Sequence, residues 1–369
     1  MKTISDLFLA LSTLDEIKPS CIFIRKLYSA FDNFFEFFTS EYNYSKLNIS
    51  CHEIEKIKIV KKALENVNLE KTKKLLDDRK IKFLALSDIK YPEKLKAIND
   101  PPFGLFYKGN LDLLKHKLAI SIVGTRSATK YGLSVARKIS ILLAKQNIVV
   151  ISGLANGIDT SAHEGAVSSG KTIAILGTGP DVIFPASNRK LYEEILEKEG
   201  LILSEYMPGI EGMPWNFPQR NRIISALSDA VVVIEGDLQS GALITARFAI
   251  KQDKPLFALP GPVDSLQSNG PNILIKSGVA ELLTSVNDIL EKIGEAKQVQ
   301  LDFKDGNKSP SELSEVQKNI YNILSSKTLS FDELVQCTNL ETKNLLTNLS
   351  ILELKGFIEK APEGGYVKV

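Results

Sequence analysis

Short apolar runs alternate with amphipathic stretches through the middle of the chain, and this alternation restricts the possible folds most strongly. Apolar runs with the length of buried strands lie at 119–124, 148–153, 172–177, 201–205, 230–235 and 255–261. Stretches with helical character separate them at 131–146, 159–169, 188–198 and 241–252. Because parallel strands need long crossovers, the pattern predicts βαβ units and a mainly parallel sheet covered on both faces.

The segments on either side of this α/β domain, predicted over 79–293, have other patterns. Residues 1–78 carry apolar side chains at helical spacing, as at Ile54, Ile57 and Leu64, and predict a helical domain. Residues 294–311 are polar and contain Gly and Pro, which is typical of a linker. The last domain, 312–369, has helical stretches followed by a hairpin signal around Gly364-Gly365, the order of a winged helix. Its predicted elements are helices at 316–325, 331–337 and 342–355 and strands at 357–360 and 366–369.

Composition narrows the class of protein. The chain has 369 residues, of which 44% are hydrophobic and 24% charged, so two or three globular domains are expected. A net charge of +2 requires any anion site to come from local arrangement. The three cysteines and three histidines are scattered, which predicts no disulfide, no metal site and a reducing, cytoplasmic location. We expect no signal peptide and no membrane span, which would need about 20 apolar residues.

Polar, glycine-rich turns follow the predicted strands, at the edge where open α/β sheets bind ligands. The first is Gly124-Thr125-Arg126-Ser127, and a helix begins soon after it. Exposed amides at a helix start, together with an arginine, favour an anion. The alternative is a tight turn with an exposed arginine. The other turns contribute Gly153, Ala155, Asn156, Gly157, Gly177, Gly179, Asn188, Ser240 and Gly241.

A second arginine-bearing segment, Phe217-Pro218-Gln219-Arg220-Asn221-Arg222, precedes the strand predicted at 230–235. Its two guanidinium groups are planar, charge-assisted donors that suit phosphate oxygens. The alternative is a helix start with solvated arginines. Phe217 and the nearby Trp215 are candidates for stacking on bases.

Two pairs of titratable residues could suggest catalysis. Asp159 and His163 lie four residues apart, and we favour a helix N-cap and a hydrogen-bonded structural histidine. Glu205 and Glu235 end predicted strands, and we favour structural hydrogen bonding for both. Asn188 is a further predicted helix cap. The sequence contains neither a Walker A lysine nor a nucleophile elbow.

Taken together, these motifs resemble the DNA processing protein A (DprA/Smf) family. The resemblance covers about residues 82–285 and rests on motifs in the family's order, namely VGTR (123–126), SGLANGID (152–159), FPASN (184–188), FPQRNRIIS (217–225), SGALITA (240–246) and the PG pair at 260–261. It implies an α/β fold with an extended Rossmann-like core, an N-terminal helical domain similar to a sterile-alpha-motif (SAM) domain, and a C-terminal winged helix. It also implies a non-enzymatic homodimer, without a cofactor, that binds single-stranded DNA and loads the recombinase RecA during natural transformation.

The resemblance also implies which residues bind DNA. Arg126 matches the arginine of the family's glycine–small–arginine motif, which is implicated in phosphate binding, and Arg220 and Arg222 match its RNR motif. The predicted DNA-binding residues are Gly124, Thr125, Arg126, Ser127, Gly153, Ala155, Asn156, Gly157, Gly177, Gly179, Asn188, Phe217, Arg220, Asn221, Arg222, Ser240 and Gly241. The chain departs from the family at Ala186, where many members have a basic residue, and at Ile17-Lys18-Pro19-Ser20, where a glycine hairpin is usual.

Two other function classes compete with this prediction. Related Rossmann-like folds process nucleotide monophosphates with a PGGxGT-type loop, which this chain lacks. A winged-helix regulator of duplex DNA would use Lys343, Asn344 or Asn348 on its recognition helix. Comparing the binding of single strands, duplexes and nucleotides separates the three classes.

Overall fold

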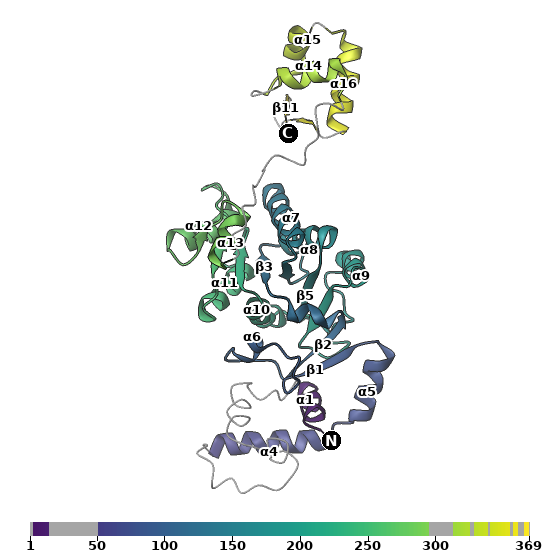
Figure 1. The fold of residues 1–369 in the computed structure, drawn as a ribbon, viewed down its shortest axis with the longest axis vertical. Helices are drawn as coiled ribbons and strands as arrows, with labels where there is room; N and C mark the ends of the chain where they lie inside the picture. The colour runs from purple at the N-terminus through teal and green to yellow at the C-terminus, as the bar shows by residue number, and fades with distance from the viewer. Residues whose placement is uncertain are drawn as a thin grey trace. The chain divides into compact units, whose positions relative to one another are not determined.

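A nine-stranded sheet organises the larger of two compact units into which the chain divides after Val299 (Figure 1). The strand order is β1-β2-β6-β5-β4-β3-β7-β8-β9. The computed structural model describes residues 3–14, 51–294, 313–324, 328–338, 340–354, 357–360 and 365–368. Each unit is described by itself.

The parallel part of the sheet confirms the six predicted strands, because buried apolar runs form each of them. Their observed bounds are β3 (Ala119–Val123), β4 (Val149–Ser152), β5 (Thr172–Leu176), β6 (Leu201–Ser204), β7 (Ala230–Val233) and β8 (Leu256–Ala258). All neighbouring pairs among them are parallel, and the short β9 (Glu281–Leu282) extends the parallel set. Nearly every side chain in these six strands is buried, as expected for strands covered on both faces.

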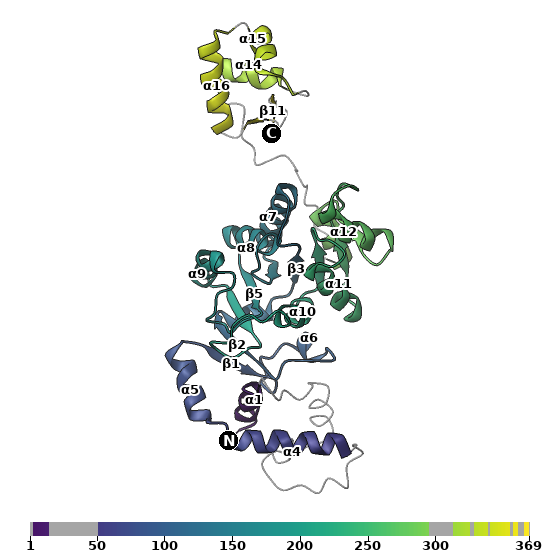
Figure 2. The same cartoon turned by 180° about the vertical axis from the view of Figure 1, so that it is seen from behind.

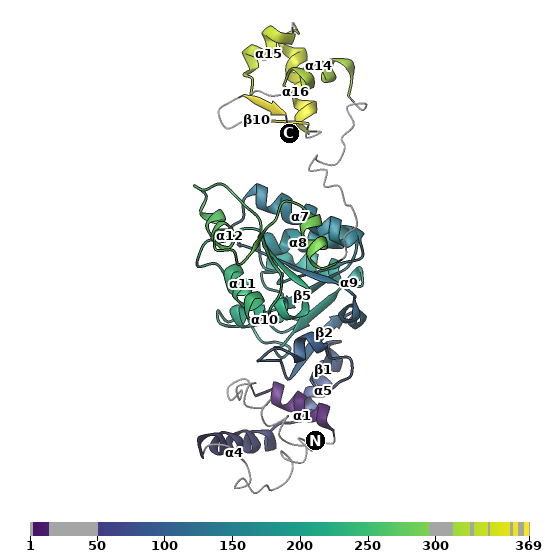
Figure 3. The ribbon, with the colours of Figure 1, turned by 60° about the vertical axis from the view of Figure 1, so that its left-hand side comes forward.

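Helices cover both faces of the sheet. The predicted helices are confirmed as α7 (Lys130–Lys145), α8 (Ile158–Ser169), α9 (Arg189–Glu197) and α11 (Gly241–Lys251). The helices α12 (Leu266–Lys276) and α13 (Val286–Lys292) were not predicted, and α10 (Asn216–Leu227) confirms the helix start that was the alternative for its segment. One group consists of α7 and α8, which pack along each other, and the other of α10 and α11, which also pack along each other. Both α8 and α10 contact β3, β4 and β5, and the two groups lie on opposite faces of the sheet (Figure 3).

The edge of the sheet opposite β9 contains two strands that the sequence pattern did not predict. The strands β1 (Lys82–Ala85) and β2 (Gly104–Gly109) are antiparallel to each other, and β2 is antiparallel to β6. The short helix α6 (Glu93–Lys96) lies between them in sequence. The helix α12 packs on β8, towards the other edge (Figure 2).

The described N-terminal residues are helical, as expected. They form α1 (Ile4–Ser12), α4 (Cys51–Glu65) and α5 (Leu69–Asp78). Leu7, Phe8 and Leu11 of α1 are buried in the same hydrophobic cluster as Leu84 of β1 and Leu105 of β2. The segment Ile17-Lys18-Pro19-Ser20 lies outside the described residues, so the SAM-like domain stays a prediction.

The smaller unit has the predicted order of three helices and a hairpin. Its elements are α14 (Glu315–Ile323), α15 (Phe331–Thr338), α16 (Thr342–Leu354), β10 (Ile358–Lys360) and β11 (Tyr366–Lys368), the two strands being antiparallel. Ile320, Leu334, Leu345 and Phe357 form its core. Most of the predicted linker lies outside the described residues. None of the helices in the described part of the chain has the length and apolar character that crossing a membrane requires.

Candidate functional site

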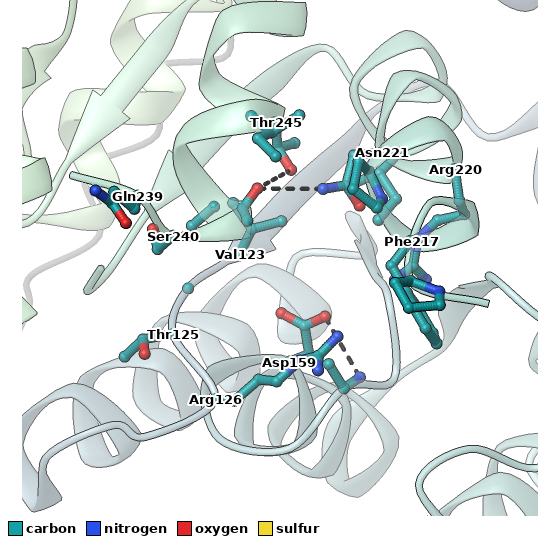
Figure 4. Close-up of a pocket in the computed structure, with 18 of the residues that line it drawn as sticks. Val123, Thr125, Arg126, Asp159, Phe217, Arg220, Asn221, Gln239, Ser240 and Thr245 are labelled. Atoms are coloured by element: carbon teal, nitrogen blue, oxygen red, sulfur yellow. Dashed lines mark hydrogen bonds between the residues drawn. The ribbon is translucent and has the colours of Figure 1, made fainter. Parts of the chain in front are cut away.

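A pocket of about 600 Å³ lies where the strand order of the sheet reverses (Figure 4). The chain passes from β3 to β4 on one side, while β7 pairs with the other side of β3, and open α/β sheets bind ligands at such switch points. Side chains from the turn after β3, from α10 and from the start of α11 surround the pocket (Figure 4).

The structure brings together about half of the predicted DNA-binding residues. Those that line the pocket are Gly124, Thr125, Arg126, Ala155, Phe217, Arg220, Asn221, Ser240 and Gly241. Those outside the lining are Ser127, Gly153, Asn156, Gly157, Gly177, Gly179, Asn188 and Arg222. Lining residues absent from the prediction are Val123, Asp159, Phe184, Gly212, Pro214, Pro218, Ile224, Gln239, Ala242, Ile244 and Thr245. Many of these residues adjoin a predicted residue in sequence, and the fold shows that they line the pocket.

The turn after β3 presents Arg126 to the pocket from a rigid base. The Thr125 amide donates to the carbonyl of Glu235 at 2.7 Å, which ties the turn to the end of β7. Thr129 caps α7, and its hydroxyl donates to the Glu235 carboxylate at 2.5 Å. The guanidinium of the exposed Arg126 lies 5.3 Å from the centroid of the Phe217 ring, within the range of a cation–π contact. Within the described residues no carboxylate pairs with Arg126, so its charge is available to a ligand.

Arg220 lines the pocket from inside the protein. Its side chain is 4% exposed, and Nη1 donates to the carbonyl of Gly153 at 2.8 Å. A Cβ atom on Gly153 would lie 2.5 Å from Nη2, so this glycine leaves the room that the guanidinium occupies. Burial lowers the pKa of Arg220 to about 10, and attraction to Asp159 opposes this shift. Arg220 thus adds positive charge to the pocket while tying α10 to the loop after β4.

The loop after β4 corrects two predicted caps. Gly157, with φ of +79°, is the N-cap of α8, whereas the Asp159 carboxylate accepts from the amides of Gly153 and Ala155. Burial raises the pKa of Asp159, and Arg220 together with these amides lowers it. Asn188 occupies the N-cap position of α9, but its side chain makes no cap bond, and its Nδ2 donates to the Leu154 carbonyl at 2.9 Å. Both side chains therefore hold the loop in place.

His163, Glu205 and Glu235 each have a hydrogen-bond partner within the protein. The ring of His163 is fully buried, and its Nδ1 lies 2.8 Å from the Thr172 hydroxyl. Burial, reinforced by the charge of Arg220, lowers the pKa of His163 to about 3. Glu235 accepts from Thr129, and Glu205 accepts from Arg222. The described residues contain no group of three His, Cys, Asp or Glu side chains that could hold a metal ion.

Arg222 lies away from the pocket in a buried ion pair. Its side chain is 4% exposed, and its two terminal nitrogens donate to the two carboxylate oxygens of Glu205 at 2.9 and 2.8 Å. Its Nε donates to the carbonyl of Asp100 at 2.9 Å. The arginines of this segment are therefore helical, but they are not solvated as the alternative prediction held.

The start of α11 completes the pocket. Its N-cap, Ser240, makes no side-chain cap bond, and a Cβ atom on Gly241 would have no neighbour within 4 Å. Asn221 and Thr245 both donate to the Gly241 carbonyl, which orients this first turn (Figure 4). Open amides at the positive end of a helix dipole favour a negatively charged ligand.

An open, mainly parallel sheet with an arginine-bearing pocket at its switch point defines an extended Rossmann-like protein. The family model for DNA recombination-mediator protein A matches residues 82–294, and that for the DprA winged helix domain matches residues 305–364. The chain belongs to the DNA processing protein A (DprA/Smf) family, which confirms the resemblance seen in its motifs.

Individual relatives agree with this assignment. Protein Smf of Synechocystis is 36% identical over 313 residues, which cover 76% of this chain and 78% of the relative. DNA processing protein DprA of Streptococcus pneumoniae is 42% identical over 213 residues, covering 58% of this chain and 74% of the relative.

Solved structures agree as well. The X-ray structure of the Streptococcus pneumoniae protein superposes with a TM-score of 0.65 at 33% identity, covering 79% of this chain and 98% of that one. DNA processing protein A of Helicobacter pylori, whose structure concerns its unique single-stranded DNA binding mode, superposes with a TM-score of 0.53 at 34% identity, covering 58% of this chain and 96% of that one.

Proposed function

We propose that this protein binds single-stranded DNA through the pocket at the β3–β7 switch point and acts as a recombination mediator. The observation that carries the proposal is Arg126, an exposed arginine without a carboxylate partner among the described residues, at a pocket that also contains the open start of α11. The single-stranded DNA binding of the Helicobacter pylori relative supports the same ligand.

Two groups provide the proposed phosphate contacts. Arg126 provides a planar, charge-assisted donor, and the amides at the start of α11 provide neutral donors. The buried charge of Arg220 strengthens the positive potential inside the pocket without being exposed itself. Arg222 is not among the contacts that we propose, because Glu205 occupies its terminal nitrogens.

A recessed site of this kind selects for flexible strands. An unpaired strand can bend one phosphate into the pocket, whereas a duplex holds its phosphates along a stiff surface. A few contacts per protomer give weak binding, so a homodimer with two such pockets would gain affinity through effective concentration. We further propose that the bound strand is passed to RecA, in keeping with the recombination-mediator description of the family.

The proposal is tested by measuring how binding of a fluorescent oligo(dT) depends on salt. For single strands the logarithm of affinity falls with the logarithm of salt by about 0.7 per phosphate contact. The Arg126→Ala variant should bind more weakly, and the magnitude of its slope should be lower by about 0.7. A duplex of the same sequence should bind more weakly than the single strand.

The Arg247→Ala variant is the matched control, since Arg247 is an exposed arginine on α11 outside the pocket lining. It loses the same charge, and its salt slope should equal that of the wild type. Failure of the wild type to bind oligo(dT) at low salt would refute the proposal. Tight binding or turnover of a free nucleotide would favour the competing class of nucleotide-processing enzymes.

A further inference from the structure

Large apolar side chains are exposed in and next to the chain segments that line the pocket. Trp215 is 63% exposed, Phe184 46% and Met213 43%. Phe184 itself lines the pocket, and Met213 and Trp215 lie on either side of the lining residue Pro214 in sequence. An apolar rim of this kind, next to a free arginine, has the composition of sites that bind unpaired nucleic acid.

The half-buried ring of Phe217 contacts Arg126 and already has other neighbours. The guanidinium of Arg126 lies 5.3 Å from its centroid, and the Phe184 ring lies 5.4 Å away at an angle of 37°. A Cβ atom on Gly177 or Gly212 would approach the ring to 2.8 or 2.7 Å. A base could stack on Phe217 only by displacing these neighbours, so this ring positions Arg126.

Trp215 has the opposite surroundings. It occupies the N-cap position of α10, directly between the lining residue Pro214 and the first turn of the helix, and its side chain makes no cap hydrogen bond. The backbone there is fixed, since the Asn216 amide donates to the carbonyl of Met213 at 2.9 Å. An anchored backbone with an exposed indole can receive a flat ligand without losing existing contacts.

We propose that Trp215 is a base-stacking platform next to the pocket-lining segment, whose ligand is an unpaired nucleobase adjoining the phosphate held by Arg126. The inference rests on the proposed function of the pocket, in which Arg126 binds a phosphate. It adds a contact to the base. Stacking on an indole accepts every base, so the platform contributes affinity without sequence preference. Paired bases in a duplex present no free face to it.

The chain itself provides the probe, because Trp215 is its single tryptophan. Titrating the full-length protein with oligo(dT) should change the intensity of tryptophan emission in parallel with binding. The Trp215→Ala variant should bind oligo(dT) roughly 5- to 150-fold more weakly at an unchanged salt slope, and Trp215→Phe should recover most of the loss. Ile89→Ala, at a 97% exposed apolar residue outside the pocket lining, should bind like the wild type.

An abasic oligonucleotide separates stacking from a merely structural effect. If Trp215 stacks on bases, the wild type should bind the abasic strand more weakly than oligo(dT), and Trp215→Ala should then cause no further loss. An equal loss on both strands would overturn the inference, as would unchanged emission at saturation with oligo(dT). These results leave the proposed function standing, since that depends on binding by the wild type and on the slope of Arg126→Ala.

Discussion

Two arginine-bearing segments meet near the same pocket, and their arginines have different surroundings. In the turn after β3, Arg126 is exposed, rests on the Phe217 ring and has no carboxylate partner within the described part of the chain. In α10, Arg222 is buried and bound by Glu205 and Asp100. The family motifs contain both residues, but only Arg126 has a charge that is free for a ligand.

The physical difference between the two arginines is hydration. A charge buried in the protein has lost its water and depends on its partners, so removing one partner is costly. An arginine at the surface keeps its water and can exchange it for a phosphate oxygen. We therefore expect substitutions in α10 to change the free energy of unfolding, and substitution of Arg126 to change binding.

The largest expected effect is the loss of stability in Arg222→Ala. Truncation would leave the Glu205 carboxylate buried without its partner, which should lower the free energy of unfolding by about 3–5 kcal/mol. Urea denaturation followed by circular dichroism measures this change. Wild-type stability combined with a reduced salt slope would instead make Arg222 a phosphate contact, and the comparison would fail.

A double substitution sharpens this test. Replacing Arg222 and Glu205 together by methionine removes both charges, and such replacements of buried ion pairs are often neutral or stabilising. The double variant should therefore recover most of the stability lost in Arg222→Ala. If it is as unstable as the single variant, the ion pair is not the cause of the loss.

The next effect concerns pH and the buried His163 near Arg220. The folded protein holds the pKa of His163 at about 3, whereas the unfolded value is about 6.5. Between these values the unfolded chain binds a proton that the folded protein does not, so stability falls as pH falls. From pH 7 to pH 5 the expected loss from this group is about 2 kcal/mol. Urea denaturation at several pH values should show that the free energy of unfolding falls less between pH 7 and pH 5 in His163→Asn than in the wild type. The same fall in both proteins would contradict the low pKa of His163.

A smaller effect is expected where the Arg126 turn joins α7. Thr129→Ala removes the N-cap of α7 and the hydrogen bond to Glu235, which should lower the free energy of unfolding by about 1 kcal/mol. Because Thr129 contributes no charge, the salt slope of DNA binding should stay at the wild-type value. A changed slope would show that the turn needs this anchor to present Arg126.

The parallel core was predictable because its strands are buried on both faces and read as continuous apolar runs, as at 119–123 and 230–233. The strands β1 and β2 were missed because they are short antiparallel strands with mixed burial rather than continuous buried runs. The helix α10 was considered only as an alternative, because its first turns contain Pro218 and polar residues that resemble a loop. Proline is tolerated in the first turn of a helix, where its missing amide hydrogen has no partner to lose.

The position of the site was predictable, since turns after parallel strands gather at one edge of the sheet. The roles of single residues depended on contacts distant in sequence. Glu205, the partner of Arg222, lies in another segment, and Asn188 holds a loop more than thirty positions away. Asp159 was wrongly predicted as a cap because Gly157 adopts a left-handed backbone that the sequence alone does not reveal.

The salt dependence of oligo(dT) binding, measured side by side for Arg126→Ala and for the double methionine variant of Arg222 and Glu205, tests the division between the two arginines most directly. We predict that the slope of Arg126→Ala is lower in magnitude by about 0.7 and that the slope of the double variant equals that of the wild type. A wild-type slope in Arg126→Ala together with a reduced slope in the folded double variant would contradict the account.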